Sequence, residues 1–279
     1  MGALSADIHI ALIGGGKMGE AILGGWLAST EGIATALTKD NFTVINPGQE
    51  RRNYLTERYG VACAANVSDL TYADIVVLAV KPQVMGEVLV ALSPLSFAKE
   101  ALFISIAAGL TTARLEAALP ARAHVVRTMP NTPLLVGEGA TAVCAGAYAH
   151  TQECALVCDL FACLGQAHLV EESIIDAVGA LSGSGPAYVA AFIEYLRDAG
   201  VNQGLARDMA ENLAMQTVYG TAKLLHETKQ TPEQVRVSVC SPGGTTLAAL
   251  ASMEAAGIAT AYDAGVAAAV HRSKELGAC

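Results

Sequence analysis

The stretch IHIALIGGGKMG, residues 8–19, decides the fold of this 279-residue chain. Its first six residues form an apolar run, which is typical of a central parallel strand that helices cover on both faces. Glycines follow at positions 14, 16 and 19, in the spacing G-x-G-x-x-G. Apolar residues at three- and four-residue steps (Met18, Ile22, Trp26) then predict a helix. Strand, glycine turn and helix in this order are the context that the dinucleotide-binding fingerprint requires.

Each glycine of the fingerprint has a physical task. Gly14 allows the tight turn, Gly16 allows the backbone to approach a pyrophosphate, and Gly19 allows the helix to pack on the strand. The N–H groups and the dipole at the helix start would hold the anion. The alternative is a turn that only joins a core strand to a core helix. The strand and the helix on either side favour the nucleotide site.

The composition argues against several classes of partner and location. A net charge of −9 argues against nucleic acid, because phosphate binding rests on Lys and Arg. No stretch has the length and apolarity of a membrane span; SGSGP interrupts the nearest one, residues 177–193, which we interpret as a loop followed by a helix. The start of the chain shows no basic region before an apolar core. We therefore expect no secretory signal and predict a cytoplasmic protein.

Seven cysteines are scattered through apolar segments, at positions 63, 144, 154, 158, 163, 240 and 279. Because they include no C-x-x-C pair, we expect free, buried thiols in a reducing compartment. Cys154 and Cys158 stand one helical turn apart, but no histidine or carboxylate at ligand spacing accompanies them. Core packing is the favoured interpretation, and no metal site is expected.

Strand and helix patterns alternate from residue 8 to about residue 170, which is the signature of a doubly wound α/β sheet. The expected strands span residues 8–13, 42–46, 61–63, 75–80, 101–106 and 123–129; the expected helices between and after them span 50–59, 84–92, a segment starting near 111, and 154–164. We therefore predict a Rossmann-type doubly wound parallel sheet, with residues 1–169 as the NAD(P)-binding domain.

Only helical patterns follow residue 171, at about 172–181, 186–199, 204–227, 232–240, 246–256 and 258–276. Residues 170–279 are therefore predicted to form a second, all-helical domain. This half is rich in alanine and poor in charge. We expect its helices to pack against a second copy of the chain.

The end of the second expected strand, FTVIN at residues 42–46, decides the choice of cofactor. NAD enzymes place an acidic residue here to hold a ribose hydroxyl, whereas NADP enzymes avoid that charge and supply arginine. This chain has Asn46 here, with Arg51 and Arg52 just beyond. We predict NADPH, with NADH as the alternative donor. The two arginines could instead only make the helix at 50–59 soluble.

The carboxyl ends of parallel strands meet at one edge, where open sheets bind ligands. Lys81-Pro82, Ala107-Ala108 and the stretch 127–133 would gather there. Lys81 could act as a catalytic acid, although Lys-Pro at a strand end more often positions the cofactor. Arg127 either anchors its loop by ion pairing or touches substrate, and the sequence leaves both open.

Two stretches of small residues in the second half could bind a small carboxylate. SGSGP, which includes Ser184, and SPGGTT at 241–246 each lead into a predicted helix. Both offer backbone N–H groups, hydroxyls and the positive end of a helix. The alternative is two ordinary helix caps.

The motifs as a set carry a family resemblance over nearly the whole chain: GGGKMG, AVKPQ at 79–83, SIAAGL at 105–110, VRTMPNTP at 126–133, ALSGSGPAYV at 180–189, SPGGTT at 241–246 and RSKELG at 272–277. In this order the chain resembles pyrroline-5-carboxylate reductase. The resemblance implies hydride transfer from NAD(P)H to the ring C=N of 1-pyrroline-5-carboxylate, the last step of proline synthesis. It also implies a helical dimerisation domain after the Rossmann domain, with dimers that assemble into a ring.

The resemblance also implies roles for individual positions. Implied cofactor contacts are Gly14, Gly15, Gly16, Lys17, Met18, Asn46, Asn66, Val80, Lys81 and Ala108. The implied carboxylate cradle is Gly243, Gly244, Thr245 and Thr246, with the hydroxyl of Thr246 reaching the ring nitrogen. Thr245 varies in the family, so its backbone N–H suffices.

The glycines and hydroxyls of the SGSGP and SPGGTT stretches suit the reduction of an imine even if the family resemblance is set aside. Hydride transfer to a ketone builds negative charge on oxygen and calls for a His, Lys or Arg donor. A protonated imine already carries the positive charge that the hydride neutralises, so positioning and a modest donor such as Thr246 suffice. Two alternatives stay open. One is a β-hydroxyacid dehydrogenase, although Lys223 lacks the neighbours of that family's lysine motif; the other is a regulator that binds NADPH without turnover.

Overall fold

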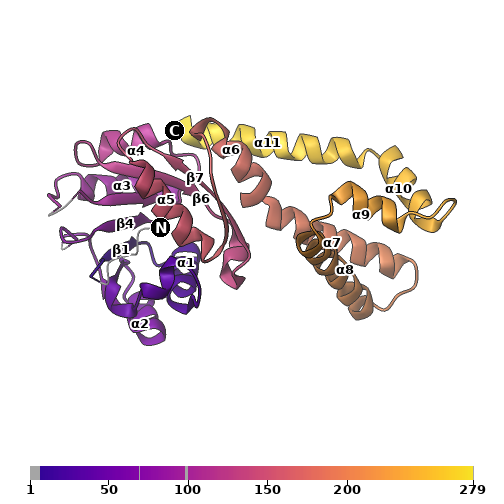
Figure 1. Cartoon of the computed structure of the whole chain (residues 1–279), viewed down its shortest axis with the longest axis horizontal. Helices are drawn as coiled ribbons and strands as arrows, with labels where there is room; N and C mark the ends of the chain where they lie inside the picture. Colours follow the sequence, from indigo (N-terminus) through magenta and orange to yellow (C-terminus); the bar gives the residue numbers. More distant parts are fainter. Residues whose placement is uncertain (1–6, 69, 98–99, 279) are drawn as a thin grey trace. The chain divides into compact units, whose positions relative to one another are not determined.

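The computed structural model describes residues 7–68, 70–97 and 100–278. Packing divides the chain into two units (Figure 1). The sheet unit comprises Met1–Ser184 and Ala269–Cys279, and the helical unit comprises Gly185–Ala268. Residues 170–184 and 269–278 therefore pack with the sheet. The functional division of the chain at residues 169 and 170 stays a prediction.

The described part of the sheet unit holds an eight-stranded sheet in the order β3-β2-β1-β4-β5-β6-β7-β8. Its strands are β1 (Ile10–Ile13), β2 (Phe42–Ile45), β3 (Ala62–Ala64), β4 (Ile75–Leu78), β5 (Leu102–Ser105), β6 (His124–Met129), β7 (Gly139–Ala145) and β8 (Gly165–Leu169). β1 to β6 pair in parallel, with Ile10 of β1 opposite Phe42 and Ile75. The predicted doubly wound sheet is confirmed for these six strands.

The far side of the sheet differs from the prediction. β7 pairs antiparallel with β6, and β8 then pairs parallel with β7. The connection at residues 130–138 is shorter than the dozen or more residues that a parallel crossover requires, so β7 must return antiparallel. The sheet is therefore mostly rather than wholly parallel, and the sequence reading missed both strands.

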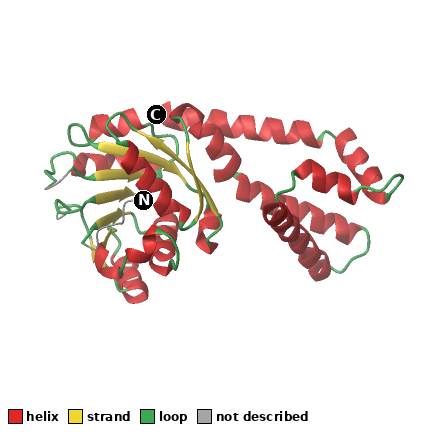
Figure 2. Cartoon of the chain, viewed as in Figure 1, coloured by secondary structure: helices red, strands yellow, loops and turns green. Residues whose placement is uncertain are grey.

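Helices cover the strands and make up the helical unit (Figure 2). The sheet unit contains α1 (Lys17–Ala28), α2 (Gln49–Tyr59), α3 (Pro82–Leu92), α4 (Thr112–Ala118), α5 (Thr151–Ala162) and α6 (Ile175–Val178). The helical unit contains α7 (Gly185–Asn202), α8 (Arg207–Thr228), α9 (Pro232–Val239), α10 (Thr245–Ala255) and the first part of α11 (Ile258–Ala278). Residues 185–268 are all described and contain no strand, as predicted.

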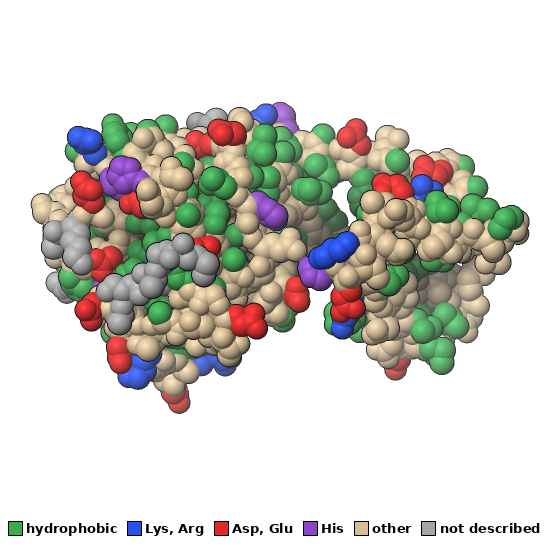
Figure 3. All heavy atoms as spheres, in the orientation of Figure 1, with side chains coloured by type: hydrophobic (Ala, Val, Ile, Leu, Met, Phe, Trp, Pro, Cys, Tyr) green, Lys and Arg blue, Asp and Glu red, His purple; other side chains and the backbone are tan. Residues whose placement is uncertain are grey.

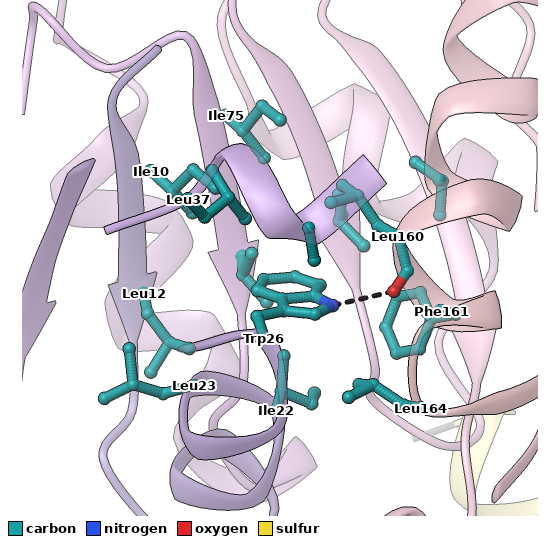
Figure 4. Packing of buried hydrophobic residues seen from close by; sticks show 14 of the residues in the cluster. Ile10, Leu12, Ile22, Leu23, Trp26, Leu37, Ile75, Leu160, Phe161 and Leu164 are labelled. Atoms are coloured by element: carbon teal, nitrogen blue, oxygen red, sulfur yellow. Dashed lines mark hydrogen bonds between the residues drawn. The ribbon is translucent and has the colours of Figure 1, made fainter. Parts of the chain in front are cut away.

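In the described part of the chain, one large apolar core lies against each face of the sheet, and a small third cluster joins Ala142 and Cys144 of β7 to Ile175 of α6. Ile10 and Leu12 of β1 belong to one core, and Ala11 and Ile13 belong to the other. Trp26 of α1 lies in the first core, fully buried, and its indole N–H donates to the Leu160 carbonyl at 2.8 Å (Figure 4). Its ring lies 5.8 Å from that of Phe161 in α5. Trp26 thus ties α1 to the last turn of α5.

The helical unit buries little apolar surface by itself. Its buried hydrophobic residues are Ala210, Ala214 and Val235, all of them small or medium in size. Large apolar side chains are exposed along its helices, and Figure 3 shows some of them on the visible face. They include Tyr195 at 72% exposure and Tyr219 at 60%. An isolated unit of this kind lacks a core that would account for its folding.

The described cysteines are free thiols, and Cys144 and Cys154 are buried while the other four are half-buried. Burial raises the pKa of the Cys144 thiol to about 12. Cys279 lies outside the described residues. Among the described residues, no helix is both long enough and apolar enough to cross a membrane.

Trp26→Phe is expected to lower the free energy of unfolding by about 2–3 kcal/mol, because it removes the indole donor and leaves the buried Leu160 carbonyl without that partner. Urea unfolding followed by circular dichroism measures the change. Tryptophan fluorescence cannot be used, because Trp26 is the single tryptophan and the substitution removes it. Val90→Ala, at a side chain that is 76% exposed, is the control and should stay within about 0.5 kcal/mol. An equal effect of the two substitutions would contradict the role of Trp26.

Candidate active site

The glycine turn after β1 brings its backbone against two neighbouring segments. Gly14 has φ +108°, and a Cβ there would lie 2.5 Å from the Ala79 carbonyl oxygen. A Cβ on Gly19 of α1 would overlap the Gly14 carbonyl oxygen. The tight turn and the close packing of α1 on the strand end are therefore both present, and both depend on the lack of a side chain.

Gly16 differs from its neighbours in the turn. It caps α1, has an ordinary φ of −69°, and is exposed. A Cβ added there would meet no protein atom within 4 Å. Packing inside the chain therefore does not require a glycine here, which is consistent with the predicted close approach of a pyrophosphate to the helix N-terminus. Lys17 is exposed and Met18 is half-buried at the start of the same helix.

The end of β2 is built around Asn46. Its side-chain oxygen accepts from the Gly15 N–H at 3.3 Å, which joins the β2 end to the glycine turn. The guanidinium of Arg52 donates to the carbonyls of Asn46 at 2.7 Å and Pro47 at 2.6 Å, and to the side chain of Gln49. These acceptors are all uncharged, so they leave the positive charge of Arg52 uncompensated at the predicted ribose position.

Arg51 makes different contacts. It donates to the Gly15 carbonyl and forms an ion pair with Glu20 of α1. Burial alone would raise the pKa of the Glu20 carboxyl, but hydrogen bonds from Arg51, Tyr54 and Tyr59 outweigh it and hold that pKa below its usual range. The charge of Arg51 is thus largely balanced by Glu20. Both arginines are half-buried and make hydrogen bonds to backbone carbonyls at this strand end. Keeping the helix soluble is therefore not their only role.

The remaining predicted cofactor residues follow the carboxyl ends of β3, β4 and β5. They are Asn66, Val80, Lys81, Pro82, Ala107 and Ala108. Since these strands are parallel to β1 and β2, the structure places the residues along the same sheet edge as the glycine turn. Lys81 is exposed and is the N-cap of α3, with Pro82 at the first helical position. This geometry leaves both roles of Lys81 open.

Arg127 of β6 holds a buried ion-pair network. Its side chain is 3% exposed, and it contacts the carboxylates of Glu172 and Asp176 at 3.2 Å each. Glu172 also accepts from the backbone N–H and the hydroxyl of Thr112, both at 2.7 Å. Thr112 begins α4 directly after the loop that contains Ala107 and Ala108. Of the two roles considered for Arg127, the structure shows ion pairing.

The last turns of α11 pack against the loop between β5 and α4. Gly109 has φ +77°, and a Cβ on Gly277 would overlap the Gly109 carbonyl oxygen. Arg114 donates to the Gly277 carbonyl at 2.8 Å, and Ser273 donates to Asp176 at 3.0 Å. The motif at 272–277 therefore supports the loop after β5 rather than contacting the glycine turn.

The SGSGP segment at 182–186, read as a loop, begins inside a turn of π-helix, Gly179–Gly183, and ends in the first turn of α7. The Ser182 hydroxyl donates to the Val178 carbonyl at 2.9 Å, and the Ser184 N–H donates to the Gly179 carbonyl at 2.9 Å. Met129 packs closely against both glycines, since a Cβ on Gly183 would lie 2.8 Å from its terminal methyl. The expected loop is therefore wrong: small residues here admit Met129 and keep the segment helical.

Asn131 is a residue of this region that the sequence analysis did not single out. It is buried, donates to the Ser182 carbonyl at 3.0 Å, and accepts from the Ala140 N–H at 2.8 Å. It therefore fixes the π-helical turn to the segment after β6. The motif VRTMPNTP contains it, but nothing local marks its distant partners.

The SPGGTT stretch forms a tight turn before α10, within the helical unit. The Gly244 N–H donates to the Ser241 carbonyl at 3.0 Å, and Gly243 has φ +68°. Gly244 caps α10, so Thr245 and Thr246 are its first two residues. Thr245 is exposed and Thr246 is half-buried. The structure thus brings the predicted cradle residues together at one helix N-terminus. It separately brings the predicted cofactor residues together along the sheet edge.

Comparison with known proteins decides the family. The chain is 42% identical over 277 residues to a pyrroline-5-carboxylate reductase from a Synechocystis species, an alignment that covers 97% of this chain and 99% of the relative. The chain belongs to the pyrroline-5-carboxylate reductase family. It is also 37% identical to the Escherichia coli pyrroline-5-carboxylate reductase over 96% of this chain and 97% of that protein.

Two domain families and two solved structures agree with this membership. Residues 172–276 match the pyrroline-5-carboxylate reductase dimerisation family, and residues 9–109 match the family of coenzyme F420-dependent NADP oxidoreductases. The Plasmodium falciparum pyrroline carboxylate reductase with NADP bound is 32% identical, with a TM-score of 0.85 and 99% of this chain and 100% of that chain covered. The Coxiella burnetii pyrroline-5-carboxylate reductase is 34% identical, with a TM-score of 0.88 and coverages of 97% and 98%.

Gly16→Ala is expected to leave the free energy of unfolding within about 0.5 kcal/mol of the parent, because its φ is ordinary and the new methyl meets no protein atom. NADPH affinity, measured by the fluorescence of bound NADPH, should fall at least about tenfold if this position approaches the pyrophosphate of the cofactor of the reductase family. Gly19→Ala is the contrasting variant and should destabilise the fold itself. Unchanged NADPH affinity in Gly16→Ala would contradict the prediction.

Arg127→Met should lower the free energy of unfolding by about 3 kcal/mol, since it leaves two partly buried carboxylates without their shared cation. Thermal or urea unfolding at a fixed protein concentration measures the change. Arg114→Met removes an exposed arginine of the same sheet unit and should cost less than about 1 kcal/mol. Equal stability of the two variants would argue against the network.

Proposed function

We propose that this chain reduces the ring C=N of 1-pyrroline-5-carboxylate to L-proline with hydride from NADPH, as the last step of proline biosynthesis. The observation that carries the proposal is the kinship with pyrroline-5-carboxylate reductases over nearly the whole chain, at 42% identity. The order of the motifs and the geometry of the glycine turn support it. NADH is the alternative hydride donor.

The residues present fit a dinucleotide. The N-terminus of α1 with Gly14, Gly15, Gly16, Lys17 and Met18 would hold the pyrophosphate, and Asn46 with Arg51 and Arg52 would hold the adenosine ribose and its phosphate. Asn66, Val80, Lys81, Pro82, Ala107 and Ala108 would line the rest of the sheet edge. When bound, the reduced cofactor supplies the hydride. Arg52 favours NADPH because its charge meets uncharged acceptors only, whereas Arg51 is paired with Glu20.

The turn before α10 is suited to the substrate carboxylate. Gly243 and Gly244 keep side chains away from the helix N-terminus, and the backbone N–H groups of Thr245 and Thr246 lie where helices hold anions. Thr246 would place its hydroxyl at the ring nitrogen, and Ser184 stays a predicted further contact of the substrate. A protonated imine needs no strong acid, so a threonine donor is sufficient.

The chain is proposed to act as a homodimer through its helical domain, with dimers assembled into a ring. The match to the dimerisation family and the exposed apolar side chains of the helical unit support the dimer. We infer that subunit assembly brings the carboxylate cradle against the sheet edge that bears Ala108. The free cysteines support a cytoplasmic location, where thiols stay reduced.

The experiment that tests the function follows NADPH absorbance on addition of 1-pyrroline-5-carboxylate, with NADH run in parallel. Oxidation of NADPH with formation of proline supports the reductase. Oxidation of a β-hydroxyacid with NADP⁺ in place of this reaction would support a hydroxyacid dehydrogenase, although Lys223 is exposed and pairs with Glu227 at 3.6 Å. Binding of NADPH with no oxidation in the presence of imine substrates would instead indicate a regulator.

Thr246→Val should lower kcat about a hundredfold while NADPH affinity stays unchanged, because it removes a proton donor at the ring nitrogen and no cofactor contact. Steady-state kinetics and an NADPH titration separate the two quantities. Thr245→Val is the matched comparison and should lose much less, since only its backbone N–H is used. Normal turnover of Thr246→Val would refute the donor role.

Arg51→Ala combined with Arg52→Ala should lower the preference for NADPH over NADH about tenfold or more, because hydrogen bonds to the charged 2′-phosphate are lost. The ratio of kcat/KM for the two cofactors measures the preference. Arg58→Ala removes a charge from the same helix without contacting Asn46 and serves as the control. An unchanged ratio in the double variant would overturn the assignment of these arginines.

A further inference from the structure

A cluster of two histidines and a glutamate lies at the opposite edge of the sheet from the candidate cofactor site. His124 begins β6, at the amino end of a strand whose carboxyl end points to the other edge. His150 is the N-cap of α5, and Glu153 lies in the first turn of that helix. None of these side chains contributes to the function proposed above. One ligand atom from each of the three lies within 4.8 Å of the other two.

The contacts within the cluster hold two of the three donors in place. Nδ1 of His124 lies 2.7 Å from one carboxylate oxygen of Glu153, and the other oxygen of that carboxylate accepts from the backbone N–H of His150 at 2.6 Å. The rings of His124 and His150 meet edge to face with centroids 4.8 Å apart. His124 is 8% exposed, whereas His150 is exposed, and a turn of its ring gives up the edge-to-face contact and its place in the capping box of α5. The site is therefore half rigid and half adjustable.

Two imidazoles and one carboxylate are a donor set that zinc and similar divalent ions accept with water as the fourth ligand. Donors about 2.0–2.1 Å from a tetrahedral ion are roughly 3.3 Å from one another. His124 and Glu153 need to separate by only a fraction of an ångström to reach that spacing, and rotation of His150 brings in the third donor. Glu100, whose carboxylate lies 3.8 Å from Nε2 of His124, adds negative charge nearby.

We propose that His124, His150 and Glu153 form a binding site for a divalent transition-metal ion of the zinc class, with water completing the coordination. Among the described residues, no buried side-chain polar atom lacks a hydrogen-bond partner, so the protein would fold without metal and bind it reversibly. Cys154 follows Glu153 in the chain but is no ligand. It is 3% exposed and packs in the same apolar core as Trp26 and Leu160.

Isothermal titration of the full chain with Zn²⁺, and its visible absorbance with Co²⁺, test the proposal. The parent should bind one ion per chain at this site, and Co²⁺ should give a tetrahedral d–d band without a thiolate charge-transfer band. His150→Ala and Glu153→Gln should each weaken binding at least about tenfold. Glutamine at the third helical position preserves the cap of α5, so Glu153→Gln separates loss of a ligand from loss of folding.

His168→Ala is the matched control, because His168 is an exposed histidine on β8 that lies outside the cluster. It should bind Zn²⁺ as the parent does, and circular dichroism should show that all the variants are folded. The absence of Zn²⁺ binding by the parent would overturn the proposal. So would unchanged affinity in both His150→Ala and Glu153→Gln, or a thiolate band with Co²⁺, since each places the ion elsewhere. These outcomes are independent of reductase activity.

Discussion

The close approach of α1 to the end of β1 is the constraint on which the rest of the site depends. Gly19 faces the Gly14 carbonyl with no room for a Cβ, and Gly14 in turn lies against Ala79 after β4. Because neither contact tolerates a side chain, the start of α1 is fixed at the carboxyl edge between two central strands. The same edge receives the turns after β2, β3 and β5. The N-terminus of α1, Asn46, Arg51 and Arg52 therefore lie together at this edge of the sheet.

Much of this arrangement could be predicted from sequence because its signals are local. Six apolar strands, the spacing of Gly14, Gly16 and Gly19, and the parallel-sheet rule together place the edge residues correctly. Strands β7 and β8 were not predicted, since β7 returns through a connection too short for a parallel crossover and its small residues carry no strong pattern. The π-helical turn was not predicted, because the glycines and the serine that it contains are equally common in loops. Its cause, the packing of Met129 against Gly179 and Gly183, is long-range.

The partners of Arg127 illustrate the same limit. Glu172 and Asp176 lie one helical turn apart, but each is more than 40 residues from the arginine that they bind. No period or spacing connects them, so sequence alone offered ion pairing and substrate contact as equal possibilities. The histidine–glutamate cluster was missed for this reason as well: His124 and His150 belong to different elements, and only the antiparallel return of β7 brings those elements together.

The division of the sheet unit into two stretches of chain has a consequence for the timing of folding. Residues 269–278 pack with the sheet, and Gly277 rests on Gly109. During synthesis the whole helical unit emerges between β5 and those final turns. The strands can pair as soon as they leave the ribosome, whereas the loop after β5 waits for the helical unit to be made before it gains its last support. A nascent chain can therefore form its sheet well before the end of α11 packs against the loop after β5.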